Sequence, residues 1–207
     1  YAPNISGPAY AMAKVANQEI SEVNLDEVSP WSIPSFRSGG TVESLHYALV
    51  DTYGQVITTD NNSIAQIVPK TSTNEGGLTG ARQVAEKGIF DFSSLSLTYP
   101  PPAENIQYLV HNSIIPNDIE TTYPIAYNHI SVTFRNCTVG EILTHTKECH
   151  ICGSEISPHS PSFNKTHMYS LSPTDTECSP CPSEAYCWGR DRIAPRENYW
   201  RASQNSL

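Results

Sequence analysis

Six cysteines, all between positions 137 and 187, are the residues with the clearest potential for chemistry. Cys149 and Cys152 have two residues between them, as do Cys178 and Cys181. Thiolates at that spacing can both reach one tetrahedral zinc ion. Zinc is disfavoured because the stretch between the two pairs exceeds the ~15–20 residues usual in zinc ribbons. It would also leave two further cysteines unused.

Three disulfides use all six cysteines and are the preferred interpretation. The segment that holds them has few bulky apolar residues, and each cross-link typically adds about 2–4 kcal/mol to folding stability. Disulfides at this density indicate an oxidising compartment outside the cell. We expect no metal site. The sequence does not determine how the six cysteines pair; they are Cys137, Cys149, Cys152, Cys178, Cys181 and Cys187.

Two groups of polar residues suggest sites that we interpret as structural. His145, His150, His159 and His167 lie among the cysteines, where we expect loop histidines with no catalytic or ligating role. Asp51, and Asp60 with Asn61 and Asn62, offer the oxygen ligands that calcium prefers. Turns stabilised by Asx side chains are the preferred explanation of both acidic positions.

Aromatic residues near the C-terminus allow two interpretations. Trp188, Tyr199 and Trp200 are predicted to pack over the disulfides, with a glycan-binding strip as the alternative.

Catalytic motifs are absent from the sequence. It contains no G-x-S-x-G elbow, no H-E-x-x-H, no P-loop and no dinucleotide fingerprint. We therefore expect a protein that is not an enzyme and that carries no cofactor.

N-linked glycans are the only non-protein groups expected. The N-x-Ser/Thr pattern occurs at Asn4, Asn61, Asn136 and Asn164, and the residues around the first, second and fourth suggest exposed positions. Asn136 lies beside Cys137, at a predicted domain junction.

Charge and hydropathy restrict the classes of partner. The net charge is −9 and no long cluster of Lys and Arg occurs, which disfavours nucleic acids and anionic membranes. No apolar stretch approaches the ~20 residues needed to cross a bilayer. The chain begins at Tyr1 rather than methionine, which we interpret as a processed secreted protein or a piece of a longer one.

The secondary structure that positions these residues is predicted to consist of short β-strands. The chain has 16 prolines and only 16% charged residues, so runs that favour helices are scarce. Apolar and polar residues alternate from Leu45 to Leu49, and again in Ile130, Val132 and Phe134. Further strands are expected over 55–58, 64–68, 79–85, 88–92, 95–98 and 106–111.

Three regions follow from these patterns. Residues 1–36 are predicted to be an N-terminal extension that acts as a linker or donates a strand to a neighbouring subunit. Residues 37–135 are predicted to form an antiparallel β-sandwich, and residues 136–207 a disulfide-stapled, cysteine-rich module.

The sandwich region resembles a known domain type. The runs Leu49 to Val56 and Gly88 to Leu97 are similar to the immunoglobulin-like domains repeated in large protist and bacterial surface proteins. The resemblance covers about 37–135 and implies an immunoglobulin-like fold, but no activity.

The cysteine region resembles the ephrin-receptor-like cysteine-rich module. The resemblance rests on Cys178 to Pro182, on Ala185 to Gly189 and on Tyr199 to Arg201, and it departs from the usual pattern at Trp188 and at 196–198. It implies a secreted or cell-surface protein.

We therefore expect a non-enzymatic structural subunit of an extracellular filament, hair or coat that self-associates. The alternative is a receptor or adhesin that binds a carbohydrate or protein ligand.

Overall fold

The structure, a computed structural model, describes residues 9–24, 31–70, 75–115, 129–153 and 168–199 of the 207-residue chain. The regular elements in these ranges are strands, which confirms the predicted mainly β class. None of the described residues forms a helix long and apolar enough to cross a membrane. The chain divides into two compact units.

The first unit comprises Tyr1–Phe36, Gly40–Thr98 and Ala103–Thr133, and the second comprises Arg37–Gly39, Tyr99–Pro102 and Phe134–Leu207. The predicted boundary at residue 135 therefore lies close to the observed one. Sequence reasoning missed the two short segments, 37–39 and 99–102, that come from the predicted sandwich and belong to the cysteine-containing unit.

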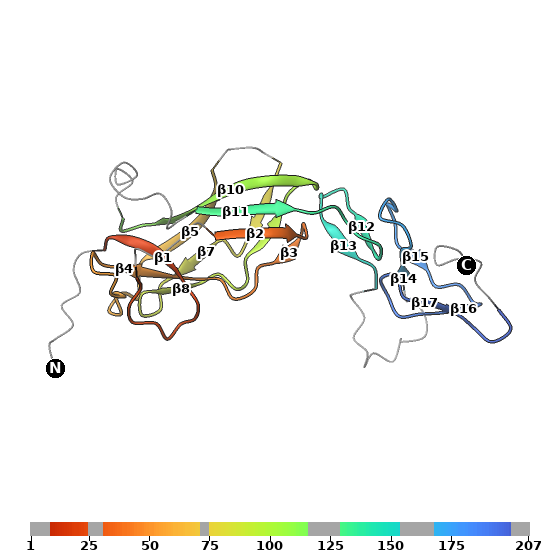
Figure 1. Ribbon diagram of the computed structural model, residues 1–207, viewed down its shortest axis with the longest axis horizontal. Helices are drawn as coiled ribbons and strands as arrows, with labels where there is room; N and C mark the ends of the chain where they lie inside the picture. The colour runs from red at the N-terminus through yellow and green to blue at the C-terminus, as the bar shows by residue number, and fades with distance from the viewer. Residues whose placement is uncertain (1–8, 25–30, 71–74, 116–128, 154–167, 200–207) are drawn as a thin grey trace. The chain divides into compact units, whose positions relative to one another are not determined.

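The strands of the first unit form three sheets (Figure 1). They are β1 (Ala11–Val15), β2 (Trp31–Phe36), β3 (Gly40–Thr41), β4 (His46–Val50), β5 (Ile64–Pro69), β6 (Gly77–Thr79), β7 (Arg82–Val84), β8 (Ile89–Asp91), β9 (Ser96–Thr98), β10 (Ala103–Asn112) and β11 (His129–Phe134), whose last residue falls in the second unit. The sheet orders are β2-β11-β10-β5-β7, β1-β4-β8 and β3-β9-β6.

The two three-stranded sheets are joined by backbone hydrogen bonds. The amide of Val42 donates to the carbonyl of Leu95 at 2.8 Å, and the amide of Phe92 donates to the carbonyl of Leu45 at 2.8 Å. The β3–β9 and β4–β8 pairs are therefore two parts of one interrupted strand pair. Figure 1 shows β4 and β8 on one side of the unit and β10 and β11 on the other.

Large apolar side chains from both sides fill the interior of the first unit. Tyr47 and Phe92 meet edge to face, with ring centroids 6.2 Å apart. Val132 of β11 is buried while its neighbours Ser131 and Thr133 are only partly so, which confirms the predicted alternation. The largest fully buried side chains of this unit are Tyr47, Phe90, Phe92, Leu45, Leu49, Ile67, Leu95, Leu97, Ile130, Val50 and Val110.

Strand β4 is buried on both faces, whereas the sequence predicted one polar face. Ala48 and Val50, on the second face, belong to an apolar cluster with Ala11, Ala13 and Val15 of β1. Ile20 and Val23 pack against the same cluster. Alternation alone was misleading here because apolar residues on the second face are covered as well, with β1 continuing the sheet beside β4 and Ile20 and Val23 packed on the cluster.

The predicted N-terminal extension is therefore corrected. Strand β1 pairs with β4 over the register Ala11↔Val50 to Val15↔His46, and β2 belongs to the five-stranded sheet. The amide of Val23 donates to the carbonyl of Gly54 at 2.8 Å. The described part of residues 1–36 is therefore part of the sandwich of its own chain, with β1 and β2 as edge strands, rather than an extension outside it.

The predicted strand over 79–85 is two strands, β6 and β7, separated at Gly80. Gly80 has φ of +70°, and a Cβ at this position would lie 2.5 Å from the carbonyl oxygen of Ser94. Only glycine tolerates that conformation and that approach without strain. The predicted strand over 55–58 is reduced to two isolated bridges, one between Glu22 and Gln55 and one between Val50 and Val56.

The second unit is built from three short hairpins. Its strands are β12 (Glu141–Leu143), β13 (Cys149–Ile151), β14 (Met168–Tyr169), β15 (Ser179–Pro180), β16 (Ala185–Cys187) and β17 (Ile193–Pro195), paired in sequence order. Its apolar cluster is small and consists of Tyr169, Ala185, Cys187 and Ile193.

Candidate functional site in the disulfide-stapled unit

All six cysteines form disulfides, as the sequence predicted. The pairs are Cys137–Cys149, Cys152–Cys178 and Cys181–Cys187, with S–S distances of 2.06 to 2.08 Å. The two cysteines of each C-x-x-C pair thus belong to different cross-links, and none of the six is free to hold zinc. Three disulfides indicate an oxidising extracellular environment.

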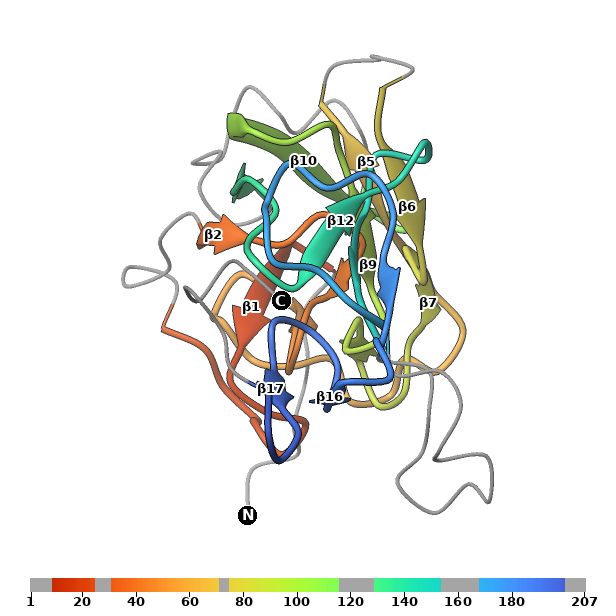
Figure 2. The same cartoon turned by 90° about the vertical axis from the view of Figure 1, so that its right-hand side faces the viewer.

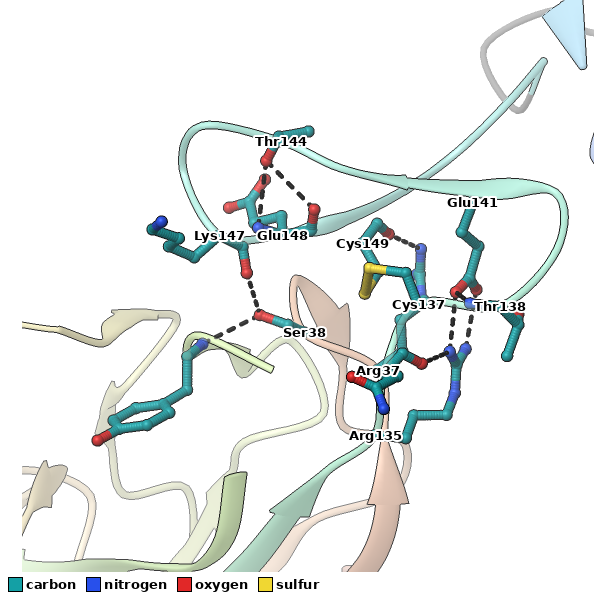
Figure 3. The surroundings of a disulfide bond; sticks show 12 residues. Arg37, Ser38, Arg135, Cys137, Thr138, Glu141, Thr144, Lys147, Glu148 and Cys149 are labelled. Atoms are coloured by element: carbon teal, nitrogen blue, oxygen red, sulfur yellow. Dashed lines mark hydrogen bonds and ion pairs between the residues drawn. A yellow bond between two sulfur atoms is a disulfide. The ribbon is translucent and has the colours of Figure 1, made fainter. Parts of the chain in front are cut away.

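The first disulfide staples the β12–β13 hairpin (Figure 3). Ser38, from a segment about 100 residues earlier, is wholly buried beside it. Its hydroxyl donates to the carbonyl of Lys147 at 2.7 Å and accepts from the amide of Tyr99 at 3.0 Å. Its carbonyl accepts from the amide of Cys149 at 2.9 Å. Ser38 therefore joins three distant segments of the second unit.

Arg37 adds a further contact to the same hairpin. Its guanidinium donates to the carbonyl of Cys149 at 3.1 Å (Figure 3). The two consecutive residues Arg37 and Ser38 therefore both bind the backbone around the disulfide-bonded Cys149.

An ion pair between Arg135 and Glu141 lies at the start of the β12–β13 hairpin. Arg135 donates two hydrogen bonds of 2.8 Å to the two carboxylate oxygens of Glu141, and the amide of Thr138 donates a third at 2.9 Å. Glu141 is buried, at 6% exposed. Burial raises the pKa of Glu141, but the hydrogen bonds from Arg135 and Thr138 outweigh it, and the pKa lies below its usual value. The bond to Glu141 also raises the pKa of Arg135.

The second disulfide lies where several backbone segments meet. The amide of Cys152 donates to the carbonyl of Gly140 at 3.0 Å, and its carbonyl accepts from the amide of Arg190 at 2.8 Å. Gly140 has φ of +88°, and a Cβ there would lie 2.7 Å from the Cβ of Arg190. Glycine is therefore needed at this contact between the first hairpin and the 189–192 turn.

The third disulfide lies on the inner face of the β16–β17 hairpin. Ala185 and Cys187 of β16 and Ile193 of β17 are buried, while Tyr186 and Trp188 are each 51% exposed. The predicted packing of Trp188 and Tyr199 over the disulfides is wrong. Cys187 points inward, and because side chains alternate along a strand, its neighbour Trp188 points outward. Tyr199 is 56% exposed, and Trp200 lies outside the described residues.

Two of the four predicted glycosylation sites lie on described residues. Asn61 and Asn136 are both exposed, so a glycan has room at either position. The oxygen of the Asn61 side chain accepts from the amide of Lys87 at 2.9 Å. Asn4 and Asn164 lie outside the described residues.

The acidic loops have the geometry of Asx turns. Asp51 is buried, and its side chain accepts from the amides of Tyr53 and Gln55 at 2.8 and 3.0 Å. Asp60 accepts from the amides of Asn62 and Ser63 and also contacts the Ser63 hydroxyl. Burial raises the pKa of Asp60, but these hydrogen bonds lower it below the usual value. In the described ranges no group of three or more His, Cys, Asp or Glu is placed to hold a metal.

The histidines of the second unit do not converge on one another in the described part of the chain. His145 is exposed in the turn of the first hairpin, and His150 is partly buried on β13. His159 and His167 lie outside the described residues.

Sequence reasoning missed Arg37, Ser38 and Glu141 as residues of this site. The signal that could have found Glu141 is the pattern Thr138-x-x-Glu141, which places a carboxylate within reach of the backbone amide three residues earlier. No local pattern indicates Ser38, because its partners are about 60 and 110 residues away.

No protein-family model matches this chain, and no curated protein matches it closely enough to indicate a relationship. A functional interpretation therefore depends on the residues of the site.

Proposed function

We propose that this chain is a non-enzymatic structural segment of a secreted extracellular glycoprotein, which self-associates into a surface coat, hair or filament. The observation that carries the proposal is the second unit, in which three disulfides and a buried ion pair hold together hairpins with only a small apolar cluster. Cross-linking of this density suits a protein that must keep its shape outside the cell. The exposed acceptors Asn61 and Asn136 fit a glycoprotein.

The strand pairing of the first unit supports the proposed immunoglobulin-like relationship. In that fold, strands B and E pair in one sheet and strands C, F and G form the other. Here β4 pairs with β8, and β5, β10 and β11 are neighbours in the second sheet. Strand A would be divided between the two sheets as β1 and β2.

The sheet edges indicate which kind of self-association to expect. Edge strand β2 contains Pro34, edge strand β7 has three residues including Arg82, and β1 carries Lys14. Proline, charge and short length all prevent edge-to-edge pairing. We therefore propose that copies meet through side chains on their surfaces rather than through an added or donated strand.

Light scattering of the secreted, glycosylated chain over a range of concentrations tests the proposal. We expect mass to rise with concentration, and electron microscopy to show repeated arrays. A chain that remains monomeric at every concentration contradicts self-association. Free thiols found by alkylation and mass measurement would contradict the extracellular location.

A groove in the first unit favours a second candidate, a receptor or adhesin. It has a volume of about 770 Å³ and lies over β5, β7 and β10, lined by Ile64, Val68, Arg82 and His111 among others. The groove is open and its walls are mixed apolar and polar, so a ligand held there would keep part of its surface in solvent. A stoichiometric ligand whose binding is lost in the Arg82→Ala and Val68→Ser variants would favour this candidate over the structural one.

A further inference from the structure

The outer face of the β16–β17 hairpin carries aromatic and charged side chains. The inner face is closed by Ala185, Cys187 and Ile193. Side chains alternate along each strand, so the outer face presents Glu184, Tyr186 and Trp188 from the first strand. The register pairs Tyr186 with Ala194, and the amide of Trp188 donates to the carbonyl of Arg192 at 2.9 Å. The hairpin is drawn in dark blue in Figure 2.

The rings of Tyr186 and Trp188 stack against each other on this face. Their ring centroids are 6.3 Å apart and their planes differ by 29°. The guanidinium of Arg196 lies over the Tyr186 ring, 4.9 Å from its centroid, and its Nε donates to the carbonyl of Ala185 at 3.3 Å. Arg196 therefore fixes the tyrosine ring in place, and both rings remain half exposed.

The opposite strand leaves room beside these rings. Ala194, the cross-strand neighbour of Tyr186, is small and only partly buried. Arg192, beside Trp188, is exposed. A ligand that lies against the rings would thus contact the small side chain of Ala194 below it and could accept hydrogen bonds from the Arg192 guanidinium at one side.

The charges on this hairpin are balanced. From Glu184 to Glu197 there are three arginines, Arg190, Arg192 and Arg196, and three acidic residues, Glu184, Asp191 and Glu197. An anionic polymer would meet Glu184 and Asp191 beside the rings. A proline-rich peptide offers carbonyl acceptors to the arginines but few donors to Glu184. The complementary ligand is uncharged, has an apolar face and has groups that both donate and accept hydrogen bonds.

We propose that this face binds an uncharged glycan, with a pyranose ring stacked on the half-exposed Trp188 ring and Tyr186 beside it. The C–H groups on one face of a pyranose carry partial positive charge and match the negative face of an aromatic ring. Its hydroxyls can accept from Arg192 and donate to Glu184. Tyr186, Trp188, Arg192 and Glu184 are the binding residues, and Arg196 is a positioning residue for Tyr186. A monomeric chain would carry the same face, so the inference does not depend on the proposed self-association.

Titration of the full-length chain with cellohexaose, mannohexaose and chitohexaose, followed by tryptophan fluorescence and calorimetry, tests this proposal. We expect at least one hexasaccharide to bind with a Kd on the order of 1 mM or tighter, because stacking on a small open face is weak. Trp188→Ala should weaken binding at least tenfold, and Trp188→Phe should retain most of it. Arg192→Ala should weaken it less than Trp188→Ala.

Tyr53→Ala is the matched control, because Tyr53 is 77% exposed in the first unit and should leave binding unchanged. Mass measurement confirms that each variant keeps its three disulfides. The proposal is overturned if no hexasaccharide binds at millimolar concentration, or if Trp188→Ala and Tyr186→Ala both bind as the parent does. It is also overturned if an oligoproline peptide binds this face and the sugars do not.

Discussion

The two units contain the same kind of secondary structure but stabilise it in different ways. The first unit has no cysteine, and its strands enclose large side chains such as Tyr47, Phe90 and Phe92 that are wholly buried. The second unit has two- and three-residue strands, a small apolar cluster and all three disulfides. Burial of apolar surface stabilises the folded state, whereas a cross-link chiefly restricts the unfolded chain.

This difference gives the hydrogen bonds of buried polar groups a larger share in holding the second unit together. Where apolar burial is limited, each buried polar group needs a partner, and Ser38 and Glu141 each take part in at least three hydrogen bonds. In the first unit, the buried hydroxyl of Tyr47 has no hydrogen-bond partner among the described residues. A large core tolerates that cost because the rest of the side chain is well packed.

Reduction of the disulfides should have the largest effect, and it should affect the two units differently. The cross-links span sequence separations of 12, 26 and 6 residues, and closing loops of these lengths is worth about 2–3.5 kcal/mol each. We expect full reduction to unfold the second unit and to leave the first folded. Region-resolved amide hydrogen exchange measures this. Protection of β16 and β17 that survives reduction, or protection of β4 and β10 lost with it, would contradict the prediction.

A cavity in the core of the first unit should destabilise that unit and leave the second unit unaffected. Phe92→Ala removes a wholly buried ring from the sandwich core and should lower the free energy of unfolding by about 3–5 kcal/mol. The disulfides contribute nothing at this position, so hydrogen exchange in β12–β17 should be unaffected. Denaturant unfolding gives the magnitude, with the exposed Tyr53→Ala as a control that should change stability by less than ~0.5 kcal/mol.

Removal of the charge on Glu141 tests the polar network of the second unit. Glu141→Gln keeps the shape but loses the charge-assisted bonds to Arg135, for an expected loss of about 2 kcal/mol in this unit. The folded-state pKa of Glu141 is lowered, so its contribution is present above the ordinary value of 4.5 and is lost as pH falls through the lowered pKa. The gap between parent and variant should therefore close in acid.

Thermal unfolding from pH 7 down to pH 2 measures that gap. The exposed Glu197 supplies a control, Glu197→Gln, in the same unit. A gap that is independent of pH would mean that Glu141→Gln acts through packing rather than through its charge.

Sequence patterns predicted the features that depend on residue type and short spacing. The β class follows from turn residues and alternation, as in β11, and the disulfides follow from an even number of clustered cysteines. The connectivity was not predictable. It depends on which strands meet: Gly153, next to Cys152, lies against the carbonyl of Met168 in β14, and β14 pairs with β15 beside Cys178.

Features that depend on distant contacts were missed or misassigned. Residues 11–15 have no clean period because β1 extends the sheet beside β4 and is buried on both faces, and Ile20 and Val23 pack against the same cluster. Trp188 was predicted to pack over the disulfides, but β16 points Cys187 inward and its neighbour Trp188 outward, and the sequence patterns did not predict that strand. Ser38 and Arg37 acquire their roles only through partners about 60 to 110 residues away.

The smallest expected effect is a gain of stability in the first unit. Tyr47→Phe keeps the buried ring and its contact with Phe92 but removes the hydroxyl that lacks a partner, so we expect stability to rise by about 1 kcal/mol. Burial raises the pKa of Tyr47 above the ordinary value of 10.0, so only the unfolded chain would ionise as pH passes 10.0. The advantage of Tyr47→Phe should therefore be constant below that pH and grow above it, by at most about 1.4 kcal/mol per pH unit. Thermal unfolding of parent and variant between pH 7 and pH 11 measures the difference, to which the other tyrosines contribute equally. A variant less stable than its parent at every pH would show that the hydroxyl has a hydrogen-bond partner in solution.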